Sequence, residues 1–160
     1  MKRLLQVCAL LALASGCAST WYPHAFEPAP LEVAVGIEGE AAAQASVLLT
    51  VRGIRRADRE AGTPVQVEVL LRLENLGETP ALLDLGELSL ETLSREVFGA
   101  PLVDPPVAEP LARGEQAQFA ASFPLPADRE FAELDLSGML LHWVVEFGDR
   151  RVTTEVTFER

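Results

Sequence analysis

Apolar and polar residues alternate along most of the chain after residue 30. The clearest stripe begins at Val65 and repeats at every second position as far as Leu73. Because successive side chains of a strand point to opposite faces, each such stripe predicts a strand with one buried face. We expect strands at residues 31–37, 46–55, 64–75, 81–92, 116–124, 130–136, 140–148 and 151–159.

Turn-forming residues separate these stripes. An Asn-Leu-Gly sequence follows the longest stripe at residues 75–77, and Gly148-Asp149 lies between the last two, as a tight hairpin requires. Only residues 39–45 have a helix-like composition, and that segment is too short to form a stable helix alone. The sequence therefore predicts an all-β protein, an antiparallel immunoglobulin-like β-sandwich of seven to eight strands.

The first residues have a different pattern. Lys2 and Arg3 precede an apolar run at residues 4–14, and small residues stand immediately before Cys17. The run is shorter than the ~20 residues that a membrane-spanning helix needs, and it fits the hydrophobic region of a secretory signal.

This order resembles the signal of bacterial prolipoproteins, in which the cysteine thiol receives a diacylglyceryl group and the peptide is cut before it. The resemblance implies a signal peptide at residues 1–16 and a lipid anchor, such as palmitate-bearing diacylglycerol, on Cys17. It also implies a place in the bacterial cell envelope, on the outer membrane facing the periplasm. The alternative is an ordinary secretory signal that is cut near Ala18 and releases a soluble protein.

A proline-rich tether is expected at residues 17–30, followed by one domain at residues 31–160. The tether contains Trp21 and Tyr22. Their amphipathic rings suit the level of lipid headgroups, and packing back onto the domain is an equal alternative.

Charge and cysteine content narrow the class of protein. The formal net charge is −11, and removal of Lys2 and Arg3 with the signal would make the remainder more acidic. Such a charge opposes binding to nucleic acid or to an anionic membrane face, where cationic side chains must neutralise phosphates. Because no cysteine follows Cys17, the domain is expected to fold without a disulfide.

Two segments resemble known sandwich domains. Residues 65–93, VQVEVLLRLENLGETPALLDLGELSLETL, are similar to the strand–Asn–Gly–strand unit of immunoglobulin-like accessory domains in bacterial lipoproteins. Residues 110–126, PLARGEQAQFAASFPLP, resemble the loop–Gly-Glu–strand–Pro segment of those domains. The same stretch is similar to the late-embryogenesis-abundant type 2 (WHy) domain, which implies a role in protection against stress and desiccation.

No catalytic motif is found in the sequence. It contains no glycine-rich phosphate loop after a strand, no HExxH and no CxxC pair. We therefore expect no enzyme activity, cofactor, metal ion or small-molecule substrate. The alternative is an envelope hydrolase in which His142 acts as the base. In a strand that places Trp143 in the core, the neighbouring His142 lies on the outer face of the sheet, which is the position that we expect.

Arginines are concentrated in one short segment. Arg52, Arg55, Arg56 and Arg59 form the densest cationic cluster of the chain. Guanidinium groups bind carboxylates or phosphates in pairs of hydrogen bonds, which makes this cluster a candidate partner-binding site. Local pairing with Asp58 and Glu60 is the alternative.

The connection at residues 94–115 is the second candidate surface. It is rich in proline, and long irregular connections in compact domains often carry function. Its apolar residues, Phe98 among them, are expected either to cap one end of the sandwich or to contact a partner. The sequence thus predicts a lipid-anchored, non-catalytic binding or structural module with an envelope protein as partner.

Overall fold

The computed structural model describes residues 21–22, 26–125 and 130–160. Eight strands and one short 3₁₀ helix occur in this part of the chain. Their bounds are β1 (Leu31–Gly36), β2 (Ala43–Arg55), β3 (Gln66–Asn75), β4 (Ala81–Thr92), β5 (Leu102–Asp104), β6 (Gln116–Pro124), η1 (Phe131–Glu133), β7 (Gly138–Phe147) and β8 (Arg150–Glu159).

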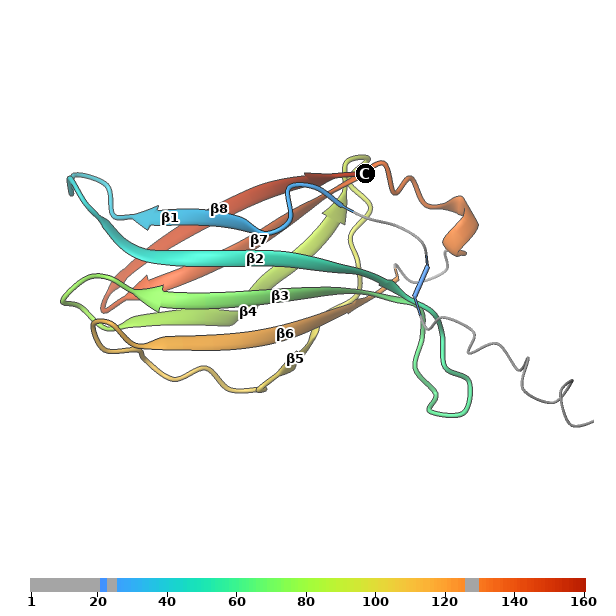
Figure 1. Cartoon of the computed structure of the whole chain (residues 1–160), viewed down its shortest axis with the longest axis horizontal. Coiled ribbons are helices and arrows are strands. Elements are labelled where there is room, and N and C mark those ends of the chain that lie inside the picture. Colours follow the sequence, from blue (N-terminus) through green and yellow to red (C-terminus); the bar gives the residue numbers. More distant parts are fainter. Residues whose placement is uncertain (1–20, 23–25, 126–129) are drawn as a thin grey trace, which may run out of the picture.

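The strands form two antiparallel sheets that face each other (Figure 1). One sheet has the order β1-β2-β3-β6-β5 and the other has the order β4-β7-β8. The predicted all-β, antiparallel sandwich is therefore confirmed. Counted from β2, the strand order matches the two sheets of an immunoglobulin constant-type domain, with β1 added at one edge.

Two facing stripes of apolar side chains form the core. The stripe on β3 points inward from Val67 to Leu73, and its apolar members are at most 1% exposed. The opposite sheet contributes Trp143 and Phe147, and β6 contributes Phe119 and Phe123. Burial of these side chains at about 25 cal/mol per Å² is the main force that holds the sheets together.

Residues of the predicted tether also pack onto the domain. Phe26 is 2% exposed and belongs to the core. Glu27 exchanges two backbone hydrogen bonds with Glu159 at the end of β8, with N···O distances of 2.7 and 2.8 Å. The folded part of the chain thus begins before residue 31.

The prediction of a strand at residues 130–136 was wrong. The chain there forms η1, in which the Glu133 amide donates to the Glu130 carbonyl at 3.0 Å. Farther on, Asp135 Oδ1 accepts the Ser137 amide at 3.0 Å. These local hydrogen bonds compete with a sheet ladder, although Leu134 in the same segment is still buried.

The two remaining irregular segments are partly in strands. Residues 94–115, expected as one long connection, include β5. This strand pairs with β6 through Leu102↔Ser122, Val103↔Ala121 and Asp104↔Ala120. The segment at residues 39–45 contains no helix, because β2 already begins at Ala43. No helix in the described residues is long and apolar enough to cross a membrane.

Asn75 lies at the point where the chain passes from the first sheet to the second. Its side chain is fully buried. Nδ2 donates to the carbonyls of Thr79 at 2.9 Å and Leu111 at 2.8 Å, and Oδ1 accepts the Gly77 amide at 3.0 Å. One amide thereby joins the β3–β4 turn to the connection before β6.

Asn75→Asp should lower the free energy of unfolding by about 3 kcal/mol, because a carboxylate oxygen would replace the donor that faces two carbonyls. Urea denaturation at neutral pH measures this loss. Gln118→Glu, the same chemical change at an exposed position of β6, is the control and should stay within about 0.5 kcal/mol. Equal effects of the two substitutions would contradict the role of Asn75.

Candidate functional site

A β-bulge in β2 places the first two arginines of the cluster. Val51 pairs with Val69, but the next paired residue is Gly53, opposite Glu68, so Arg52 is an extra residue. Gly53 has a φ of 125°, which other residues rarely adopt. After the bulge, the positions whose side chains point inward are shifted by one residue, so Ile54 enters the core.

Arg52 and Arg55 therefore lie on the same outer face. Their guanidinium groups share the Glu68 carboxylate, with N···O distances of 3.4 Å from Arg52 and 3.2 Å from Arg55. Glu68 is 13% exposed, whereas the arginine side chains are 48% and 41% exposed. One carboxylate thus holds two cations, which leaves a surplus of positive charge at this position.

Two aromatic residues from the predicted tether complete the surface. Trp21 forms an isolated antiparallel bridge with Arg55, and the Tyr22 amide donates to the Ile54 carbonyl at 2.8 Å. The Arg52 guanidinium lies 5.3 Å from the centre of the Trp21 ring. Trp21 and Tyr22 are half-buried, which supports the alternative that they pack onto the domain.

The Tyr22 ring lies between two partners. It stacks on Phe131 of η1, with ring centres 4.1 Å apart and planes inclined by 13°. The Arg56 guanidinium lies 4.8 Å from the Tyr22 ring centre. Cation–π contacts of this kind contribute roughly 0.5–1 kcal/mol each at exposed sites.

The loop between β2 and β3 carries the fourth arginine, Arg59. Asp58 organises this loop, because its Oδ1 accepts the amides of Glu60 and Ala61 at 3.0 Å each. Among the described residues, neither Arg56 nor Arg59 forms an ion pair with a carboxylate. The alternative of local pairing with Asp58 and Glu60 is therefore not what the structure contains.

We call this set the arginine–aromatic surface. It lies at one end of the sandwich, beside the β2–β3 loop and η1 (Figure 1). Its members are Trp21, Tyr22, Arg52, Arg55, Arg56 and Arg59. Cys17, the predicted lipidation site, lies outside the described residues.

Phe98 does not belong to any exposed surface. It is 5% exposed and is part of the core, and its amide donates to the Leu90 carbonyl at 2.9 Å. Phe98 therefore caps the sandwich and its ring is not available to a partner. The exposed apolar residues of the same connection are Val97, Leu102 and Val107.

His142 lies on the outer face of β7, as expected, between two carboxylates. Its Nε2 is 3.3 Å from Glu91 Oε1 on β4, and its Nδ1 is 3.6 Å from Glu155 Oε2 on β8. Arg95 also pairs with Glu91. Burial raises the pKa of Glu91, but hydrogen bonds from His142 and Arg95 lower it, and the net result is a pKa below the ordinary value of 4.5.

A depression of about 320 Å³ adjoins His142 and includes Ser89. It lies where β4 departs from β7, between the pairs Asp84↔Val144 and Ser89↔His142. A hydrolytic site would need an imidazole nitrogen free to accept the serine proton. Both nitrogens of His142 instead lie beside carboxylate oxygens, on Glu91 and Glu155.

Trp143 lines the same depression and is fully buried. Its indole N–H has no hydrogen-bond acceptor among the described residues. A buried donor of this kind costs about 1–3 kcal/mol unless a water molecule accepts from it.

Comparisons with known proteins give little further information. No protein-family model and no curated protein matches the sequence. A solved structure that matches this chain is the crystal structure of a FixG-related protein from Vibrio parahaemolyticus, with 14% identity and a TM-score of 0.43. The match covers 73% of this chain and 96% of that one.

Sequence patterns found the arginines but missed their partners. Glu68 belongs to an alternating strand and carries no signal that it pairs with two residues of β2. The glycine directly after Arg52 is the one local sign of the bulge, since an isolated glycine inside a strand pattern often marks one.

Gly53→Ala should lower the free energy of unfolding by roughly 1–3 kcal/mol, because alanine is strained at a φ of 125°. Chemical denaturation measures the change. Gly36→Ala is the control, since a Cβ there meets nothing within 4 Å, and it should stay within about 0.5 kcal/mol. A harmless Gly53→Ala would mean that the bulge is not required.

Glu91→Gln should make stability less dependent on pH in the acid range. Since folding lowers the pKa of Glu91, its stabilising effect is complete above the ordinary value of 4.5 and is lost as the pH falls through the folded-state pKa. The substitution should cost about 1 kcal/mol at neutral pH and flatten the acid decline, as seen in urea unfolding at a series of pH values. Ser89→Ala, on the same face of β4, should leave the slope unchanged, and an unchanged slope in Glu91→Gln would contradict the prediction.

Proposed function

We propose that this protein is a lipoprotein of the bacterial cell envelope, held on a membrane by a diacylglyceryl group on Cys17. We further propose that its sandwich acts as a non-catalytic binding or structural module for an envelope protein. The observation that carries the proposal is that Cys17, which follows a lipoprotein-type signal, stands only four residues before Trp21, and Trp21 packs on the sandwich.

The first support is the order of residues before Cys17. A basic start, a short apolar run and two small residues precede the cysteine, and a thiol at that position is the nucleophile that lipidation requires. One acyl chain binds membranes only marginally, whereas two or three give stable anchoring at ~0.8 kcal/mol per buried methylene.

The second support is the seating of Trp21 and Tyr22 on the sandwich. Trp21 pairs with Arg55, and Tyr22 is held by a backbone hydrogen bond and by stacking on Phe131. Trp21 is the fourth residue after Cys17. An anchor on Cys17 would thus be joined almost directly to the folded domain.

The non-catalytic part of the proposal rests on His142. Its two ring nitrogens face Glu91 and Glu155, and the same sheet face carries a further network in which Arg151 pairs with Asp84, Glu87 and Glu146. Surface networks of this kind favour binding or structural roles over proton transfer.

A partner could add a strand to the second sheet. β8 is an edge strand, and its outer side is paired in the described chain only at the Glu27↔Glu159 bridge. The stretch from Arg151 to Thr157 therefore offers backbone donors and acceptors, which is the usual basis of strand addition.

Cys17→Ser should abolish palmitate labelling and move the protein from the membrane fraction to the soluble fraction. Cys8→Ser is the matched control, because Cys8 is the chain's only other cysteine and it stands inside the signal. The control should keep both the label and the membrane location. A Cys17→Ser protein that stays labelled and membrane-bound would disprove the anchor.

The same cells test the binding role. Mild crosslinking of the lipidated protein should yield one stoichiometric envelope partner. Protection of unrelated enzymes during drying, without such a partner, would favour the WHy-like alternative instead.

A further inference from the structure

We infer that the arginine–aromatic surface lies against the phospholipid headgroups and that its arginines pair with lipid phosphates. The inference rests on the proposed anchor at Cys17 and adds an orientation to it. The sandwich would then stand with the β2–β3 loop toward the membrane and its other end in the aqueous compartment.

Chain length brings the surface to the membrane. Four peptide units separate Cys17 from Trp21, and consecutive Cα atoms are about 3.8 Å apart, so the two residues can be separated by at most about 15 Å. Since Trp21 pairs with Arg55 and contacts Arg52, the end of β2 shares this limit. An anchored molecule cannot hold this end far from the lipid.

The chemistry of the surface suits a headgroup layer. Indole and phenol rings prefer the membrane–water interface, where an apolar ring and a polar edge are both satisfied. Trp21 and Tyr22 are each covered on one face by a guanidinium group, at 5.3 and 4.8 Å from the ring centre. Guanidinium groups on aromatic rings keep donors free for bidentate contacts with phosphate.

Arginines that have no ion pair among the described residues lie at the same end. Arg52 and Arg55 share one carboxylate, and Arg56 and Arg59 form no ion pair among the described residues. Carboxylates are present at this end too, on Asp58 and Glu60 in the loop and on Glu130 and Glu133 at η1. Those of Asp58 and Glu133 accept backbone amides. The attraction is therefore a local one between guanidinium groups and phosphates.

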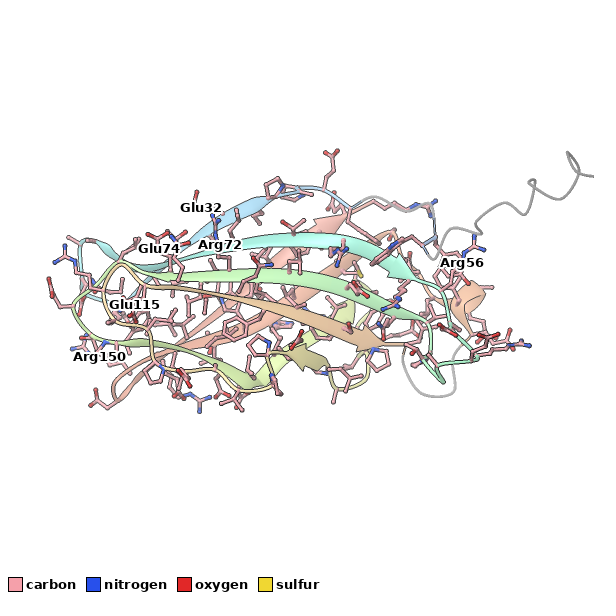
Figure 2. All side chains as sticks on the ribbon, turned by 60° about the horizontal axis from the view of Figure 1, so that its bottom comes forward. Glu32, Arg56, Arg72, Glu74, Glu115 and Arg150 are labelled. Carbon is pink, nitrogen blue, oxygen red and sulfur yellow. The ribbon has the colours of Figure 1, made fainter. Side chains whose placement is uncertain are left out.

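The opposite end of the sandwich has a different charge pattern. Figure 2 shows Arg56 at one end of the molecule and Arg150 and Glu115 at the other. Arg150 pairs there with Glu40 at 2.9 Å, and Arg113 pairs with Glu78. Each of these two arginines is paired with one glutamate, so it offers less to a phosphate.

The two tryptophans of the chain allow a direct test. Trp21 belongs to the arginine–aromatic surface, and Trp143 is fully buried in the core. The lipidated full-length protein is reconstituted into phosphatidylcholine–phosphatidylglycerol vesicles whose acyl chains carry bromine close to the headgroup. Bromine should quench the fluorescence of the wild type and should leave Trp21→Phe, which retains only Trp143, unquenched.

Arginine variants test the phosphate contacts. Arg56→Gln and Arg59→Gln should each lower the ratio of headgroup-contacting to detached orientations roughly fivefold, which appears as weaker quenching of Trp21. The matched control is the pair Arg113→Gln and Arg150→Gln, which removes two arginines from the opposite end and should leave quenching unchanged.

The outcomes separate the inference from the proposed function. A protein that floats with the vesicles, but is quenched equally in the wild type and in Trp21→Phe, would overturn the orientation and leave the anchor intact. Equal loss of quenching in both arginine pairs would overturn the phosphate contacts. Absence of palmitate label from the wild type would overturn the anchor itself.

Discussion

The sandwich depends on the buried amide of Asn75, which holds the crossing from one sheet to the other. Its three side-chain hydrogen bonds join the end of β3, the following turn and the carbonyl of Leu111. Leu111 in turn exchanges two backbone hydrogen bonds with Ala81 at the start of β4. The position of β4 under the first sheet, and hence the facing of the two apolar stripes, follows from this junction.

At the other end of the sandwich the deciding constraint is the bulge at Arg52 and Gly53. A regular strand would place Ile54 on the same face as Arg52, because alternate residues share a face. The extra residue instead puts Ile54 into the core and both Arg52 and Arg55 outside, next to Glu68. One backbone irregularity thus serves packing and charge placement together, as bulges often do near functional surfaces.

Most of the fold could be predicted from the alternation of residues, because an antiparallel sheet with one buried face has a strong period of two. Seven of the eight expected strands are present, and the failure at residues 130–136 has a local cause. Leu134 and Leu136 are buried as the pattern required, but Glu133 and Asp135 take part in local hydrogen bonds that replace the ladder. Burial and strand formation are separate properties, and the pattern reports only the first.

The candidate site was less accessible to sequence reasoning. The arginines were recognisable as a cluster, but their partners Trp21, Tyr22 and Glu68 stand elsewhere in the chain and meet them only through the fold. The same holds for Phe131, which stacks on Tyr22. Phe98 lies in an irregular, proline-rich connection, and the sequence left open whether it caps the sandwich or contacts a partner. Its burial shows that an irregular backbone can still supply core side chains.

The strong negative charge of the chain does not oppose a membrane-facing arginine surface. Screening at physiological ionic strength limits electrostatic effects to about 8 Å, so a membrane responds to the nearest end of a protein more than to its net charge of −11. Carboxylates at the opposite end, beside Arg150 and Arg113, lie beyond that range, so they have little effect on the interaction with the membrane. The orientation therefore depends on contacts at the near end, where the guanidinium groups of Arg56 and Arg59 have no carboxylate partner among the described residues.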